Sequence, residues 1–152
     1  MADNDWAVLD TRSEQTRVLG VVHQRFALSQ ELDAYPWNLK LSIRFIDLKP
    51  NGWPTRDENE AASNEENALT ELLESTGHVR YFGRRTERDE RETIYRLDDP
   101  DTARPIIEQF VSDPRCRRIS DYTITPDPER NELEWYFELL DTQANVNRRD
   151  PA

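Results

Sequence analysis

Apolar and polar residues alternate without interruption along residues 37–45. Successive side chains of a strand point to opposite faces, so this pattern predicts a strand with one buried side and one polar side. The polar side is expected to carry Asn38, Lys40, Ser42 and Arg44. The residues expected on the buried side are Trp37, Leu39, Leu41, Ile43 and Phe45.

Two other segments have the spacing of amphipathic helices. Thr55 and Glu58 form the Thr-x-x-Glu pattern of a capping box, in which each side chain bonds to the backbone of the other residue. A helix is therefore expected over residues 56–75, with Gly77 as its stop. A second helix is expected within residues 101–111, where apolar residues recur every three or four positions. They are Ala103, Ile106, Ile107, Phe110 and Val111.

Short runs of apolar and β-branched residues predict the remaining strands. Residues 6–26 have the pattern of a hairpin that turns at the sequence TRSEQ. Residues 78–99 predict a second hairpin with a charged turn. Residues 117–125 and 133–140 predict two further strands, separated by a loop rich in proline and charged residues.

The order of these elements predicts an α+β fold. Residues 1–141 are expected to form a single domain, and residues 142–152 a flexible C-terminal tail. The central elements follow the β-α-β-β-α-β order of a ferredoxin-like sandwich. An N-terminal hairpin and a C-terminal strand are added to it. Two helices should cover one face of an antiparallel sheet.

Charge sets the chain apart from an average domain of its size. The 152 residues include 31 acidic and 20 basic side chains, a net charge of −11. Such a surface repels nucleic acids and anionic lipids and attracts basic proteins. We therefore expect no membrane contact and no nucleic-acid partner. The alternative is that the charge serves only to keep the protein in solution.

The single cysteine, Cys116, excludes an intramolecular disulfide and a cysteine metal cluster. The N-terminus has neither the basic start nor the apolar run of a signal peptide. No stretch approaches the ~20 apolar residues of a membrane helix. These features predict a reduced, cytoplasmic protein.

Residues 51–77 contain seven carboxylates, and most of them should face water on the predicted helix. On a helical wheel, the apolar arc consists of Ala61, Ala62, Ala68, Leu69, Leu72 and Leu73. Glu58 and Glu65 point into this arc. Glu58 has a role in the capping box, but Glu65 needs a partner, because burying an unpaired carboxylate is costly. It is expected either to pair with Arg44, Arg80 or Arg84, or to line a pocket.

Known catalytic patterns are missing from the sequence. His23 and His78 have no partner at metal-ligand spacing, and a hydrogen-bonded structural role is expected for both. Four glycines are too few for a phosphate-binding loop or a dinucleotide fingerprint. The three arginines near Cys116 could lower its thiol pKa, but no histidine follows as a base, so an ordinary thiol is expected. We expect no cofactor and no metal.

The second predicted hairpin contains the one basic cluster of the chain. Tyr81 and Phe82 lie among its arginines, which are Arg80, Arg84, Arg85, Arg88 and Arg91. Arginine beside aromatic residues can bind phosphate or RNA. Nearby acidic residues offset this charge, so an exposed charged turn is the alternative.

The predicted C-terminal strand would have one apolar face and one mixed face. Leu133, Trp135, Phe137 and Leu139 would face the core. The opposite face would present Glu134, Tyr136 and Glu138. An acidic and aromatic surface of this kind suits an arginine-rich protein partner. Ordinary solvent exposure is the alternative.

These motifs together resemble the family called domain of unknown function 695. The similarity spans the chain from Trp6 to about Leu140, although three inserted residues, ERN, lengthen the last turn. The matching positions are Gly52, Pro54, Glu58, Glu65, Gly83, Arg84, Tyr95, Trp135 and Tyr136. The resemblance implies a fold but no reaction. In layout and charge the chain is also similar to the regulator of ribonuclease activity B family, whose members are acidic ferredoxin-like inhibitors.

Three hypotheses for function follow. The first is a non-enzymatic acidic binding protein that acts as an inhibitor or immunity-type regulator of a basic protein, such as a nuclease or toxin. The second is a small-ligand binder or enzyme whose pocket holds Glu65 and the hairpin arginines. The third is a homodimer joined through an exposed sheet edge.

Overall fold

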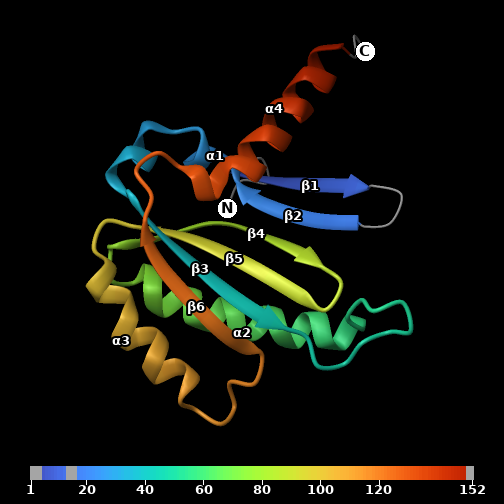
Figure 1. The fold of residues 1–152 in the computed structure, drawn as a ribbon, viewed down its shortest axis with the longest axis vertical. Helices are drawn as coiled ribbons and strands as arrows, with labels where there is room; N and C mark the ends of the chain where they lie inside the picture. The colour runs from blue at the N-terminus through green and yellow to red at the C-terminus, as the bar shows by residue number, and fades with distance from the viewer. Residues whose placement is uncertain (1–4, 13–16, 150–152) are drawn as a thin grey trace.

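The computed structural model describes residues 5–12 and 17–149 as a mixed α+β structure built on one antiparallel sheet (Figure 1). Its six strands lie in the order β1-β2-β4-β5-β3-β6. Their bounds are β1 Trp6–Arg12, β2 Arg17–His23, β3 Trp37–Arg44, β4 Val79–Glu87, β5 Glu90–Leu97 and β6 Ile119–Pro126.

Helices cover both faces of this sheet. The longer ones are α2 (Arg56–Glu74), α3 (Pro100–Val111) and α4 (Glu134–Arg149). The short ones are α1 (Gln24–Ala27) and the 3₁₀ helices η2 (Gln30–Ala34) and η3 (Asn131–Leu133). In Figure 1, α2 and α3 lie on one face, and α1 and α4 lie on the other. Each face has its own apolar cluster, so the sheet is the middle of three layers.

Strand β3 confirms the predicted alternation. Leu39, Leu41 and Ile43 are fully buried against α2 and α3. The strand pairs with β5 on one side and β6 on the other, which gives its backbone partners along both edges. The predicted hairpins over residues 6–26 and 78–99 are also present, as β1-β2 and β4-β5. The first predicted turn covers residues 11–15, of which 13–15 lie outside the described part of the chain.

Helix α2 begins where the sequence predicted. The Thr55 hydroxyl accepts a hydrogen bond from the Glu58 backbone N–H at 3.2 Å. The return bond of the capping box is not formed, because the Glu58 carboxylate instead accepts the Ile46 N–H at 2.8 Å. The helix ends just before Gly77, whose φ of +79° favours glycine.

The buried face of α2 differs from the predicted arc. Ala68 and Leu72 are exposed, so the helix is rotated relative to the expectation. Its buried residues are Glu58, Ala62, Glu66, Leu69 and Leu73. No individual role was predicted for Glu66, yet its buried carboxylate faces the sheet.

Residues 133–140 correct the prediction of a C-terminal strand, because they form η3 and the start of α4. Leu133, Tyr136 and Leu140 are buried at helical spacing, whereas Glu134 and Glu138 are exposed on the other side. Tyr136 therefore does not share a surface with the two glutamates. Helix α4 continues through residues 142–149, where a flexible tail was predicted; residues 150–152 lie outside the described part.

A buried arginine holds the start of this C-terminal segment in place. Arg96 of β5 donates to the Asp127 carboxylate at 2.9 Å and to the Asp127 carbonyl at 2.8 Å. It also donates to the carbonyl of Tyr35 at 3.1 Å. Asp127 in turn accepts the backbone N–H of Asn131 and Glu132, which starts the helical turn.

The β1-β2 hairpin extends the sheet beyond the layer formed by α2 and α3. On the opposite face, its Ala7 and Leu9 are buried near α4. On the α2 face, Val8 is 67% exposed. Part of one sheet face is therefore left open to solvent. None of the helices described is long and apolar enough to cross a bilayer.

Tyr136 provides a test of the helical C-terminus. Its ring is buried against Phe82 at 5.3 Å, and its hydroxyl has no hydrogen-bond partner among the described residues. We expect Tyr136→Ala to cost about 3–5 kcal/mol of unfolding free energy, because it leaves a large cavity. Tyr136→Phe should change stability by less than about 1 kcal/mol, since no hydrogen bond is lost. Urea denaturation measures both, with Glu138→Ala as the exposed control. A negligible cost for Tyr136→Ala would contradict the helical packing.

Candidate functional site

A cleft of 880 Å³ lies between the open face of the β1-β2 hairpin and the start of α2. Small-molecule sites in proteins have similar volumes. Among the described residues, those that line it include no Asp and no Glu. Three of its arginines nevertheless pair with carboxylates just outside the lining, Arg84 and Arg91 with Glu66 and Arg17 with Asp10. Six cationic residues line it: Arg17, Lys49, Arg56, Arg84, Arg88 and Arg91.

Strand register places apolar and cationic residues side by side on the floor of the cleft. Directly paired residues of antiparallel strands project from the same face of the sheet. Val8 pairs with Val21, and Val21 pairs with Arg84, which forms one row across three strands. Asp10, Leu19, Thr86 and Arg91 form the neighbouring row. On the hairpin side the floor therefore carries the apolar residues Val8, Leu19 and Val21 beside the Asp10–Arg17 ion pair, and toward α2 it is cationic.

A bulge in β4 turns Arg84 toward the cleft. The pairing of β4 with β5 shifts between Tyr81 and Gly83, so one extra residue is inserted there. Arg80 and Arg84 are four residues apart and would share a face in a regular strand. After the bulge they lie on opposite faces. Arg84 faces α2, where it meets Glu66.

Arg84 and Arg91 share the carboxylate of Glu66. Its oxygens lie 3.3 Å from Arg84 Nη1 and 3.1 Å from Arg91 Nη1. The Tyr81 hydroxyl donates to the same carboxylate at 3.3 Å. Burial and the charge of Glu66 raise the pKa of Tyr81, so its hydroxyl stays protonated. Two cations with one anion leave an excess of positive charge at this point.

Arg91 is the rigid centre of this cluster. Its guanidinium also donates to Asn59 at 2.7 Å, to Ser63 at 3.2 Å and to Thr86 at 3.1 Å. Burial and the neighbouring charge of Arg84 lower the pKa of Arg91. Because arginine starts from a very high pKa, the side chain remains charged.

The loop before α2 forms the outer wall of the cleft. The Lys49 N–H donates to the Trp53 carbonyl at 2.7 Å, and the Gly52 N–H donates to the Lys49 carbonyl at 2.9 Å. These bonds fold the loop back on itself and give it a defined shape. In the described part of the chain, neither Lys49 nor Arg56 forms an ion pair with a carboxylate.

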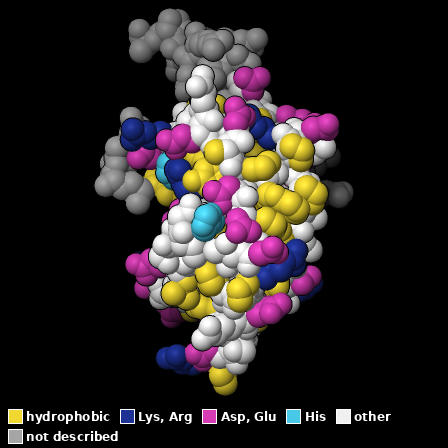
Figure 2. Space-filling view, turned by 90° about the vertical axis from the view of Figure 1, so that its left-hand side faces the viewer, with side chains coloured by type: hydrophobic (Ala, Val, Ile, Leu, Met, Phe, Trp, Pro, Cys, Tyr) yellow, Lys and Arg dark blue, Asp and Glu magenta, His cyan; other side chains and the backbone are white. Residues whose placement is uncertain are grey.

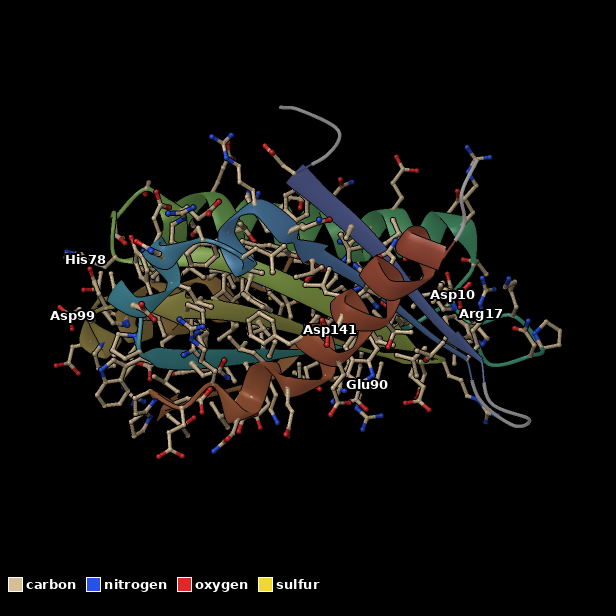
Figure 3. All side chains as sticks on the ribbon, turned by 90° about the horizontal axis from the view of Figure 1, so that it is seen from above. Asp10, Arg17, His78, Glu90, Asp99 and Asp141 are labelled. Atoms are coloured by element: carbon tan, nitrogen blue, oxygen red, sulfur yellow. The ribbon has the colours of Figure 1, made fainter. Side chains whose placement is uncertain are left out.

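The other two cations of the lining lie at the rim. Arg17 pairs with Asp10 at 3.0 Å, and Figure 3 shows this pair at the end of the molecule where α2 starts. Arg88 lies beside Gly52 of the outer wall. His78 and Asp99 mark the opposite end in Figure 3. Arg17 and Asp10 thus lie at one end of the molecule. On the side seen in Figure 2, acidic side chains are scattered among apolar ones.

Glu65 lies elsewhere and has a different partner from those predicted. Its carboxylate contacts Arg118 at 2.6 Å and accepts the backbone N–H of Arg117 at 3.0 Å. Arg118 also bonds Glu58 at 2.7 Å, and this bond is the main reason why the Glu58 pKa is lowered. The predicted salt bridge is present, but Arg44, Arg80 and Arg84 are the wrong partners. The reason is the 100° turn per residue, which aims Glu66, and not Glu65, at β4.

Arg80 is also separate from the cleft. Its guanidinium lies 4.3 Å from the centre of the Phe26 ring and pairs with Glu31 at 3.1 Å. Of the predicted basic cluster, Arg84, Arg88 and Arg91 line the cleft. The other residues predicted for a binding site do not reach it. Arg80 lies on the opposite sheet face, Glu134 and Glu138 lie on α4, and Tyr136 is buried in the core.

A second groove, of 780 Å³, runs between α2 and α3 and includes Glu65. Leu72, Phe110 and Cys116 give it an apolar lining. Burial and the nearby Glu65 carboxylate raise the pKa of the Cys116 thiol. The arginines of the surrounding loop therefore do not activate it, which agrees with an ordinary thiol.

Both histidines have hydrogen-bonded roles, as predicted. His23 Nδ1 accepts the Phe26 N–H at 3.1 Å, and His78 Nδ1 lies 2.7 Å from an Asp98 oxygen. Within residues 5–12 and 17–149, no group of three or more His, Cys, Asp or Glu residues is placed to hold a metal ion.

No protein-family model, curated protein or solved structure matches this chain. The resemblance to the domain of unknown function 695 family therefore stays a prediction, as does the similarity to the regulator of ribonuclease activity B family.

Glu66 should be the key carboxylate for stability. Glu66→Gln leaves Arg91 buried without a counter-charge, so we expect a loss of about 3–5 kcal/mol in the free energy of unfolding. Chemical denaturation measures this loss. Glu71→Gln removes an exposed carboxylate of the same helix and should change stability by less than about 0.5 kcal/mol. Equal stabilities for the two variants would show that the buried pair contributes nothing.

Proposed function

We propose that this protein binds a small anionic ligand, one with a phosphate or a similar oxyanion, in the cationic cleft. The observation that carries the proposal is the lining itself, whose described residues include six cations and no carboxylate in a chain of net charge −11. The carboxylates of Glu66 and Asp10 contact three of these cations from outside the lining. The predicted small-ligand alternative, a pocket with Glu65 and the hairpin arginines, is thereby proposed with Arg84 and Arg91 but without Glu65. The protein is proposed to act as a binding protein and not as an enzyme.

The way in which the cations are held supports this proposal. A structural arginine is normally satisfied by one carboxylate, but Arg84 and Arg91 share Glu66. Lys49 and Arg56 stand at the same cleft without carboxylate partners in the described part of the chain. Like charges repel, so gathering them costs free energy in the absence of a ligand. A bound anion would remove this repulsion.

The remainder of the surface favours a small anion over a long one. A negative exterior repels an extended polyanion wherever the polymer leaves the cleft. A single phosphate-bearing molecule meets only the local positive field. This reasoning is consistent with the expectation that the protein has no nucleic-acid partner.

We propose that the elements from β3 to β6 form a ferredoxin-like unit to which the N-terminal hairpin is added. The strand order β4-β5-β3-β6, with α2 and α3 as the two crossovers, supports this assignment. In this description the cleft lies at the junction between the added hairpin and the ferredoxin-like unit.

Titration with inorganic pyrophosphate tests the binding proposal. We expect measurable binding by calorimetry at low salt, and affinity should fall as ionic strength rises. Arg56→Glu should weaken binding roughly tenfold by reversing one charge at the cleft. An acidic residue in the first turn of α2 is favoured by the helix dipole, so the variant should fold.

Arg117→Glu is the matched control, because it makes the same charge change at an exposed site outside the cleft. It should leave affinity within about twofold of the unmodified protein. No binding below roughly 10 mM pyrophosphate, or equal weakening by both variants, would rule out the cleft as an anion site.

A second candidate function is the predicted one, an acidic surface that binds a basic protein such as a nuclease or toxin. One observation favours it: Glu134, Glu138 and Asp141 are all exposed on α4 and follow helical spacing. They form an acidic stripe on one side of the helix. The cytoplasmic location and the homodimer through a sheet edge stay predictions.

Replacing this stripe with neutral residues tests the second candidate. The triple variant Glu134→Gln, Glu138→Gln and Asp141→Asn should lose salt-sensitive binding to a basic ribonuclease, measured by surface plasmon resonance. Asp57→Asn, Glu60→Gln and Glu71→Gln remove the same charge from the exposed side of α2 and serve as the control. Equal binding by the two triple variants would attribute any attraction to net charge alone.

A further inference from the structure

We infer that the ligand of the cleft is a nucleoside phosphate, held with its phosphate against the arginines and its base on the open sheet face. The inference rests on the proposed anion-binding function and adds the chemical class of the ligand. It follows from the two chemically different halves of the cleft floor.

The row Val8–Val21–Arg84 sets the size of the ligand. Adjacent strands lie about 4.8 Å apart, so Val8 is roughly 10 Å from Arg84 across the sheet. An anion bound at Arg84 has the apolar side chains of Val21 and Val8 directly beside it in the same row, whereas the charged pair Asp10–Arg17 lies in and beyond the next row. A bare phosphate would leave this surface uncovered, whereas a phosphate ester about 10 Å long would cover it.

The exposure of the floor supports a flat apolar group. Val8 is 67% exposed, and Leu19 and Val21 are half-buried although they lie inside a sheet. Helix α2 covers this face of the sheet at β4 but does not cover the hairpin strands β1 and β2. The three side chains form a continuous apolar surface at the edge of a cationic site. A purine or pyrimidine ring could lie flat against such a surface.

The outer wall adds an aromatic side chain. Trp53 lines the cleft and is half-buried. Its backbone carbonyl accepts the Lys49 N–H, and this hydrogen bond closes the loop. Because the loop is held by backbone hydrogen bonds, the indole is presented without a large ordering cost. Indole rings are favourable partners for bases and for the faces of sugars.

The donor set indicates that the phosphate is held by the protein itself. Magnesium sites for nucleotides use carboxylates, and the part of this lining that the structure describes has none. Arginine and lysine side chains supply the positive charge in their place. We therefore expect binding to persist when divalent cations are chelated.

Calorimetry with matched fragments of one nucleotide tests this inference. In EDTA, AMP should bind about tenfold more tightly than ribose 5-phosphate, because only AMP covers the apolar floor. Val8→Ser should weaken AMP about three- to tenfold and leave ribose 5-phosphate within about twofold. Leu28→Ser, which alters an apolar side chain of similar exposure outside the cleft, is the control.

Three results would overturn the nucleotide assignment. Equal affinities for AMP and ribose 5-phosphate would mean that the site recognises the phosphate and gains nothing from the base. The proposed anion binding would still stand. Tighter binding of a single-stranded oligonucleotide than of AMP, with a steep salt dependence, would point to a polymer. Failure of AMP, ribose 5-phosphate and pyrophosphate to bind would overturn the anion-binding function as well.

Discussion

The carboxylate of Glu66 fixes how α2 lies on the sheet. It is 1% exposed and contacts Arg84, Arg91 and Tyr81 from two adjacent strands. A buried charge is tolerated only when it is paired and hydrogen-bonded, so the helix can sit at only one rotation about its axis. That rotation buries Leu69 and Leu73 and leaves Leu72 at the surface. The same contacts hold the two arginines at the floor of the cleft.

Strand β5 carries a buried arginine–carboxylate ion pair on each of its two faces. Arg91 faces α2 and Arg96 faces the α4 side, and each is almost fully buried with a carboxylate partner, Glu66 or Asp127. The two arginines join segments that are far apart in the sequence. Arg91 ties the hairpin to α2, whereas Arg96 ties it to the connections around β3 and α4. In a chain with 34% charged residues, buried ion pairs thus perform part of the task that apolar packing performs elsewhere.

Local patterns were sufficient for most elements, and long-range contacts decided the rest. The strand at residues 37–45, the start of α2 at Thr55 and both hairpins follow from alternation, capping and turn signals. The C-terminal helix does not, because its apolar residues fit a strand as well, and the contact of Arg96 with Asp127 spans 31 residues. The basic hairpin that supplies Arg84, Arg88 and Arg91 was predicted, but the shape of the cleft was not, because it needs the bulge at Phe82–Gly83 and the pairing of β2 with β4. A glycine inside a predicted strand was the one available signal for that bulge.

The attachment of the N-terminal hairpin has a consequence for motion. Strands β1 and β2 pair over seven residues, but β2 joins β4 over only four, from Leu19 to Val22. Among the described strand pairs, β2–β4 thus has the fewest paired residues, so the hairpin is joined to the rest of the sheet by a short strand pairing. One side of the cleft belongs to the β1-β2 hairpin and the other to β4, β5 and the start of α2. A bound ligand would therefore contact both sides and oppose separation of β2 from β4. Amide exchange along β2 would then report occupancy from the backbone alone.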